Sequence, residues 1–155
     1  KIVMKYLTLL LLAATSPAFA GSSSIYLNND YRQVFATPSG NILCGGDSQK
    51  RTKTGKPRTN DLYCFIGLNE AMPKRCEKQG EGLDFTLNAK GKAAMSCAGF
   101  EFVPVNEGYE ETRVLKYGET ISGQGWSCRS ETSGLSCQNN DGHGFSINRK
   151  EYRLF

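Results

Sequence analysis

The chain has 155 residues, a formal net charge of +4 at neutral pH, 39% hydrophobic residues and 22% charged residues. This length predicts one domain, and the composition excludes collagen-like, coiled-coil and strongly disordered proteins. Because the chain has one histidine and six cysteines, a multi-histidine metal site is excluded, and we predict neither a required metal nor a cofactor.

Residues 1–20 combine a basic start, an apolar run and the small-residue pattern Ala18-Phe19-Ala20 ahead of Gly21. This pattern is typical of a secretory signal peptide. The apolar run is shorter than the roughly 20 residues that a membrane-spanning helix needs, and no second run of that length follows. We therefore expect an exported protein, periplasmic or extracellular, that does not span a membrane. Its single disulfide-rich β domain would be residues 21–155.

Short strand-forming segments follow, each bounded by Gly, Ser, Asn or Pro. They are 33–36, 41–44, 62–66, 83–88, 93–97, 113–117, 125–128, 135–138 and 145–148. Residues 69–79, with Pro73 in their interior, predict a turn or a short helix that begins at Pro73. Residues 148–155 predict one helical turn or an extended tail. The strand spacing indicates an all-β fold, a small disulfide-stapled antiparallel sandwich or barrel built from hairpins.

The cysteines predict a disulfide framework. They are Cys44, Cys64, Cys76, Cys97, Cys128 and Cys137. None belongs to a CxxC pair, so disulfides are favoured over a zinc site in an exported protein. Cys128 and Cys137 flank turn-forming residues at 132–134. Cys44 and Cys64 end two apolar stretches that a polar loop separates. We predict pairing between neighbours in the sequence: 44–64, 76–97 and 128–137.

The polar loop between the first two cysteines is strongly basic. Its cations are Lys50, Arg51, Lys53, Lys56 and Arg58. With both ends of the loop held by a disulfide, they would present a positive patch to a protein or to an anionic envelope polymer. The low net charge favours the simpler interpretation, a solubilising loop. No aromatic residues alternate with the basic ones, so we expect no nucleic-acid binding.

A catalytic interpretation would centre on the only histidine, His143, with Asp141 as its acid-base partner. A nucleophile would then come from Ser133 or Ser136. The sequence has no G-x-S-x-G elbow, and the glycines at 142 and 144 indicate a tight turn with positive φ angles. We therefore favour a turn-forming aspartate and a histidine that packs or caps a strand end.

Other acidic and aromatic residues are weaker candidates for a functional site. The cluster Glu107, Glu110 and Glu111 lies in a polar stretch and indicates a solvated loop rather than a glycosidase pair. Asp30, Asp47 and Asp141 lack the ligand spacing of an EF-hand. The aromatic residues Trp126, Tyr117, Phe100, Phe102 and Phe145 would form either a carbohydrate-facing platform or part of the core. We favour the core, because Trp126 lies close to Cys128 in the sequence.

Two segments of the chain resemble each other. Residues 82–90 align without gaps with residues 142–150 and share a Gly, a Phe, a hydroxyl residue, an aliphatic residue, an Asn and a Lys. A duplication would explain this, and so would two hairpins that use the same turn and strand chemistry. We favour the second explanation, because repeat architectures show several copies at a fixed period.

Several turn-and-cysteine motifs also occur in one order. They are Phe35-Ala-Thr-Pro-Ser-Gly-Asn-Ile-Leu-Cys44, Tyr117-Gly118, Cys128-Arg-Ser-Glu-Thr-Ser-Gly-Leu-Ser-Cys137 and Asp141-Gly-His-Gly-Phe145, followed by Arg149, Tyr152 and Phe155. With these motifs, residues 35–155 resemble an uncharacterised family of small secreted, cysteine-containing bacterial proteins. The resemblance implies export, disulfides and a β-rich fold, and it implies no catalytic residue.

Together these features predict a secreted, non-enzymatic interaction module. It would act as an envelope-associated binding protein or as an inhibitor of a lytic enzyme. The alternative is a small secreted hydrolase that uses His143 and Asp141.

Overall fold

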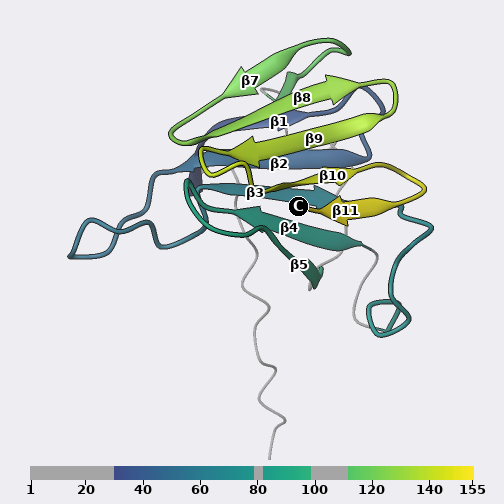
Figure 1. Ribbon diagram of the computed structural model, residues 1–155, viewed down its shortest axis with the longest axis horizontal. Helices are drawn as coiled ribbons and strands as arrows, with labels where there is room; N and C mark the ends of the chain where they lie inside the picture. Colours follow the sequence, from purple (N-terminus) through teal and green to yellow (C-terminus); the bar gives the residue numbers. More distant parts are fainter. Residues whose placement is uncertain (1–29, 79–81, 99–111) are drawn as a thin grey trace, which may run out of the picture.

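The computed structural model describes residues 30–78, 82–98 and 112–155. Its strands form two sheets that stack face to face as a sandwich (Figure 1). The strand order is β5-β4-β3-β2-β1-β6 in the first sheet and β11-β10-β9-β8-β7 in the second. The predicted all-β fold is confirmed, as a sandwich rather than a barrel. One pairing departs from the antiparallel pattern, because β6 runs parallel to β1.

The strands are short, as their sequences predict. The first sheet contains β1 (Tyr31–Ala36), β2 (Ile42–Ser48), β3 (Leu62–Ile66), β4 (Leu83–Leu87), β5 (Ala94–Cys97) and β6 (Arg113–Val114). The second sheet contains β7 (Thr120–Ser122), β8 (Trp126–Glu131), β9 (Gly134–Asn139), β10 (Gly144–Ile147) and β11 (Tyr152–Leu154).

Three segments resolve or correct the sequence predictions. Residues 69–78 form turns, with the Cys76 amide donating to the Pro73 carbonyl at 2.7 Å. The tail at 148–155 is extended and contributes β11. The strand predicted at 113–117 ends at Val114, and β7 was not predicted because only one apolar residue, Ile121, lies between its polar ends.

No helix in the described part of the chain is long and apolar enough to cross a membrane.

The three predicted disulfides are confirmed. Cys44 and Cys64 lie directly opposite each other on β2 and β3, with Cα atoms 4.1 Å apart. Cys128 and Cys137 lie opposite each other in the same way on β8 and β9, at 4.0 Å. The third disulfide, 76–97, ties the segment after β3 to β5. Each sheet therefore has one crosslink inside it, and the turns that follow β3 are anchored to β5.

The two sheets repeat one another. Strands β1 to β5 form a first meander, in which the aligned row is Phe35, Cys44, Cys64, Phe85 and Met95. Strands β7 to β11 form a second meander, in which the aligned row is Ile121, Cys128, Cys137, Phe145 and Leu154. Both rows place two cysteines and then a phenylalanine on successive strands. The likeness noted between residues 82–90 and 142–150 thus extends in order and register over five strands.

Candidate functional site

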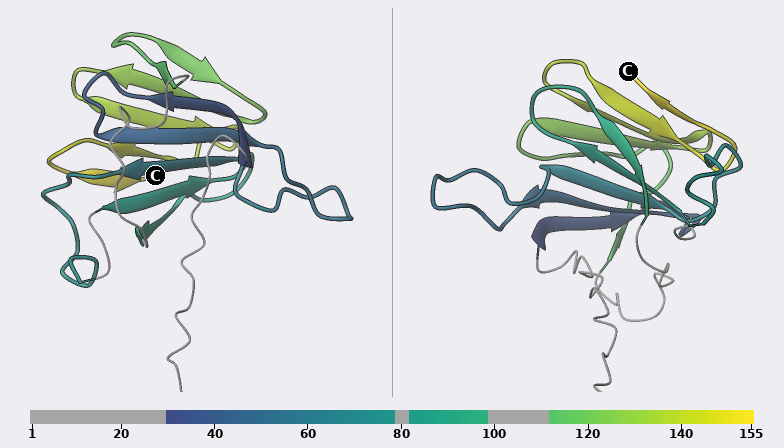
Figure 2. Two further views of the ribbon diagram at one scale, coloured as in Figure 1. Left: turned by 180° about the vertical axis from the view of Figure 1, so that it is seen from behind. Right: turned by 90° about the horizontal axis from the view of Figure 1, so that it is seen from below.

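The basic loop of residues 49–61, called the basic arm here, is an ordered hairpin that continues β2 and β3. Its backbone is paired from Lys50, whose carbonyl accepts from the Arg58 amide at 2.8 Å, to Thr52, whose amide donates to the Lys56 carbonyl at 2.7 Å. Gly55 closes the turn with a φ of 79°, which glycine adopts without strain. The arm extends beyond the two sheets at one end of the sandwich (Figure 2).

At its base, the arm is held by partly buried polar contacts. Ser48 is a buried residue, 3% exposed, and its hydroxyl lies 2.7 Å from the Thr59 hydroxyl. The Gln49 amide donates to the Asp30 carbonyl at 2.8 Å. These contacts join the arm to the end of β2 and to Asp30, which immediately precedes β1, so its cations are presented from a fixed base.

The five predicted cations are all exposed on this arm. Lys50 forms an ion pair with Asp30 at the base. The other four have no ion pair within the described ranges. They are Arg51, Lys53, Lys56 and Arg58. The arm therefore carries a concentration of positive charge that the described residues do not neutralise.

Two further cations, which the sequence analysis did not include, lie beside the base of the arm. Lys90 and Lys92 are exposed on the turn between β4 and β5. This turn is joined to the arm by Asp61, whose carboxylate accepts from the Ala89 amide at 2.9 Å. A hollow of about 450 Å³ lies there, lined by residues 56–61 and Asn88. Lys90 and Lys92 lie close to the arm only because β3 pairs with β4. No local sequence signal therefore marks them as neighbours of the arm.

The turn that contains Asp141 and His143 lies at this same end, and its polar groups hold the two sheets together. Asp141 accepts from the Gly91 amide at 2.9 Å. The Asn139 side chain accepts from the His143 amide at 3.0 Å and donates to the Gly91 carbonyl at 2.7 Å. Within the described residues, the imidazole of His143 has no hydrogen-bond partner. Gly142 has the expected positive φ, 78°.

Gly144 does not have a positive φ, which corrects the prediction for this glycine. It is needed for a different reason. A Cβ atom added there would lie 1.9 Å from the carbonyl oxygen of Cys137. The strands β9 and β10 therefore approach too closely at this point for any side chain.

The two candidate nucleophiles lie elsewhere on the second meander. Ser133 precedes β9 and His143 follows it, so about 20 Å of extended chain separates them. Ser136 is exposed in the middle of β9, opposite Ser146. The structure joins no serine hydroxyl to His143 by a hydrogen bond within the described ranges.

The aromatic residues divide between core and surface. Trp126 and Phe145 are buried, as favoured from the sequence, whereas Tyr117 is 50% exposed. Phe100 and Phe102 lie outside the described residues, as do the predicted signal peptide and the acidic cluster Glu107, Glu110 and Glu111. No group of three or more potential metal ligands occurs among the residues that the structure does describe.

Asp47 is a structural residue that the sequence analysis did not single out as such. Its carboxylate accepts from Gln33 at 2.8 Å, from the Gln124 amide at 2.7 Å and from the Trp126 indole at 2.9 Å. Burial by itself raises the pKa of Asp47, but the hydrogen bonds, with a smaller contribution from the charge of Arg32, hold it below its ordinary value of 3.8. Asp47 thus bridges the two sheets at the arm end as an ionised carboxylate.

The described part of the chain is a disulfide-linked β-sandwich of two equivalent meanders, with a basic hairpin at one end. The chain belongs to a family of unknown function, DUF6636, which matches residues 6–155. Searches of the curated proteins and of the solved structures found no match to it.

Proposed function

We propose that this protein is an exported, non-enzymatic interaction module that binds an anionic envelope polymer through its basic arm. The observation that carries the proposal is the set of four exposed cations, on an ordered hairpin, that have no ion pair within the described ranges. A loop serving only solubility needs no fixed geometry, whereas this arm is paired along its backbone.

The chemistry favours an extended polymer of phosphate or carboxylate groups over a compact ligand. The cations are spread along the arm and continue to Lys90 and Lys92, while the hollow at the base of the arm is open to solvent. Exposed cations bind such a polymer through many weak contacts, each of which is screened by salt. Export rests on the signal peptide predicted at 1–20, and it agrees with the three disulfides.

The test is binding of the purified, oxidised protein to long-chain polyphosphate and to polyglutamate, measured by calorimetry at several salt concentrations. We expect affinity to fall steeply with salt, because it arises from charge neutralisation. In an arm-neutral variant, Lys50, Arg51, Lys53, Lys56 and Arg58 are all replaced by Gln. This variant should lose at least about tenfold in affinity, since each contact contributes up to about 1 kcal/mol.

The matched control replaces cations away from the arm, Lys74, Arg75 and Lys78, by Gln. These residues are also exposed, so their loss lowers the net charge without touching the arm. The control removes three charges and the arm-neutral variant five, so an equal loss of affinity per removed charge in the two variants would assign binding to net charge and overturn the proposal. Turnover of envelope glycans, peptides or esters that disappears in His143→Ala would support the hydrolase alternative instead.

A further inference from the structure

The equivalence of the two meanders allows the two ends of the sandwich to be compared. At the arm end, Trp126 from the second meander fills the space between the sheets. Its indole donates to Asp47 at 2.9 Å. Its ring lies so close to β2 that a Cβ atom added at Gly46 would be 2.1 Å from it. A large side chain and a carboxylate from opposite sheets therefore close this end.

At the other end, the equivalent positions carry different residues. Counted from the aligned cysteines, Ile42 corresponds to Trp126 and Glu131 corresponds to Asp47. Ile42 is smaller than tryptophan and has no side-chain donor. Glu131 forms an ion pair with Arg129 of its own strand. Neither contact that closes the arm end is therefore repeated here.

The result is a cleft of about 530 Å³ between the ends of the sheets, a size within the range of about 300–1,000 Å³ that is typical of small-molecule sites. Turns from both meanders line it, together with Leu68 and Tyr117. It lies at the end of β2 opposite the basic arm, because Ile42 begins that strand and Ser48 ends it. The cleft is therefore separate from the arm.

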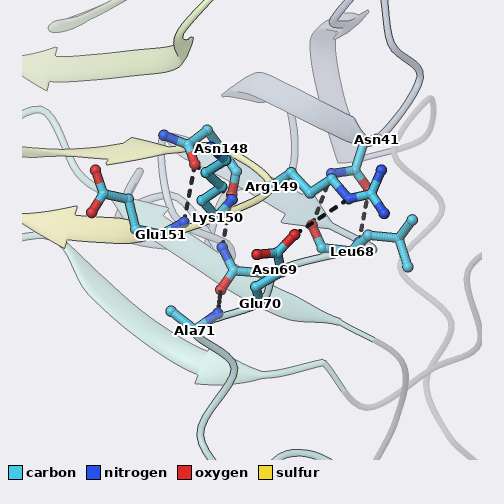
Figure 3. Close-up of polar contacts among 9 residues, drawn as sticks. All are labelled: Asn41, Leu68, Asn69, Glu70, Ala71, Asn148, Arg149, Lys150 and Glu151. Carbon is cyan, nitrogen blue, oxygen red and sulfur yellow. Dashed lines mark hydrogen bonds and ion pairs between the residues drawn. The ribbon is translucent and has the colours of Figure 1, made fainter.

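Hydrogen bonds within the protein fix the rim of the cleft (Figure 3). The Asn41 side chain donates to the Leu68 carbonyl at 2.9 Å and accepts from the Leu68 amide at 2.7 Å. Asn69 donates to the Asn148 carbonyl at 2.8 Å. The Asn148 side-chain oxygen accepts from the Lys150 amide at 2.7 Å. The Asn69–Asn148 contact joins the two meanders and the others hold each turn in place, so the cleft is formed before any ligand arrives.

Several lining groups are left without a partner inside the described part of the protein. They are the hydroxyls of Thr132 and Ser133, the side-chain N–H groups of Asn148 and the ammonium of Lys150. Glu131 pairs with Arg129 and Arg149 pairs with Glu70, so the unpaired charge of the lining is the positive charge of Lys150. The ring of Tyr117, half exposed, adds a flat apolar surface.

From this arrangement we propose that the cleft binds an acidic saccharide, such as a short oligomer of hexuronic acid. Hydroxyl and amide groups suit the many hydroxyls of a sugar, and Lys150 suits its carboxylate. The Tyr117 ring provides a surface for the apolar face of a pyranose ring. A peptide fits less well, because strand addition needs an open sheet edge, whereas turns line most of this cleft.

The test uses the oxidised protein with tetragalacturonate, and NMR amide shifts with calorimetry as the readouts. We expect shifts at Tyr117, Ser133 and Lys150, and about tenfold weaker binding of the neutral oligosaccharide maltotetraose, which lacks the charged contact. Tyr117→Ala should weaken the binding of both sugars. Lys150→Gln should weaken only the binding of tetragalacturonate.

Matched controls are Val114→Ala, at a residue that is 49% exposed and outside the cleft, and Lys74→Gln; both should leave affinity unchanged. The arm-neutral variant should still bind tetragalacturonate, which separates this inference from the proposed function of the arm. Loss of the cleft shifts in that variant, equal shifts at the cleft with tetraglutamate, or no shifts at the cleft with tetragalacturonate would each overturn the assignment.

Discussion

Phe85 and Phe145 face each other across the core, with ring centroids 5.3 Å apart. Each lies beside the second cysteine of its own meander, Cys64 or Cys137. The two equivalent residues of the repeat are therefore also direct neighbours in space. This contact joins the two sheets at corresponding points and makes the core a shared product of both meanders.

Replacing either ring should destabilise the fold by a similar amount. Phe85→Ala and Phe145→Ala each remove a fully buried ring, at a cost of about 3–5 kcal/mol. The double variant should cost about 0.5–1.5 kcal/mol less than the sum, because the contact between the rings is lost in either single variant. Chemical denaturation of the four proteins measures this, and strict additivity would contradict a direct coupling of the sheets.

Stability at acid pH should depend on Asp47. Its folded pKa lies below the ordinary value of 3.8, so the ionised carboxylate stabilises the fold above that value, and this contribution is lost as the pH falls through the folded pKa. Asp47→Asn should reduce stability at pH 7 by about 1 kcal/mol, and the difference should shrink as the pH falls below 3.8. Fluorescence of Trp126, the single tryptophan, reports the unfolding. A difference that does not change with pH would show that the charge is unimportant.

The two disulfides within the sheets should differ in their contribution to stability. Cys44 and Cys64 are separated by 20 positions, whereas Cys128 and Cys137 are separated by 9. Chain entropy predicts about 3 kcal/mol for the longer loop and about 0.7 kcal/mol less for the shorter one. Paired Cys→Ala variants, compared by denaturant titration, measure the difference. The opposite order would indicate that packing at the second site outweighs loop length.

Two buried serines should respond differently to removal of the hydroxyl. Ser130 is fully buried and its hydroxyl has no partner among the residues described, whereas that of Ser48 contacts Thr59. Ser130→Ala should be neutral or stabilising, because it removes an unsatisfied polar group. Ser48→Ala should cost about 1 kcal/mol. Thermal melts of the two variants provide the comparison, and a comparable loss in Ser130→Ala would mean that its hydroxyl is satisfied.

The amino-acid sequence alone determined the fold class, most of the strands and all three disulfide pairs. These features depend on local signals, because Gly-bearing turns separate short apolar runs that end in cysteine. The sequence also identified the cations of the basic arm, since they lie within nine consecutive positions. The strand β7 was missed because a single buried residue, Ile121, gives no alternating pattern.

The features that depend on strand register and on contacts between the sheets are visible only in the tertiary structure. Only the strand pairing shows that the resemblance of 82–90 to 142–150 extends over two whole meanders. Only the packing of those meanders shows that Trp126 closes one end while Ile42, at the equivalent position, leaves the other end open. The cleft joins residues more than a hundred positions apart, such as Thr37 and Asn148. Local sequence patterns carry no signal for such contacts, because long-range pairing decides which turns meet.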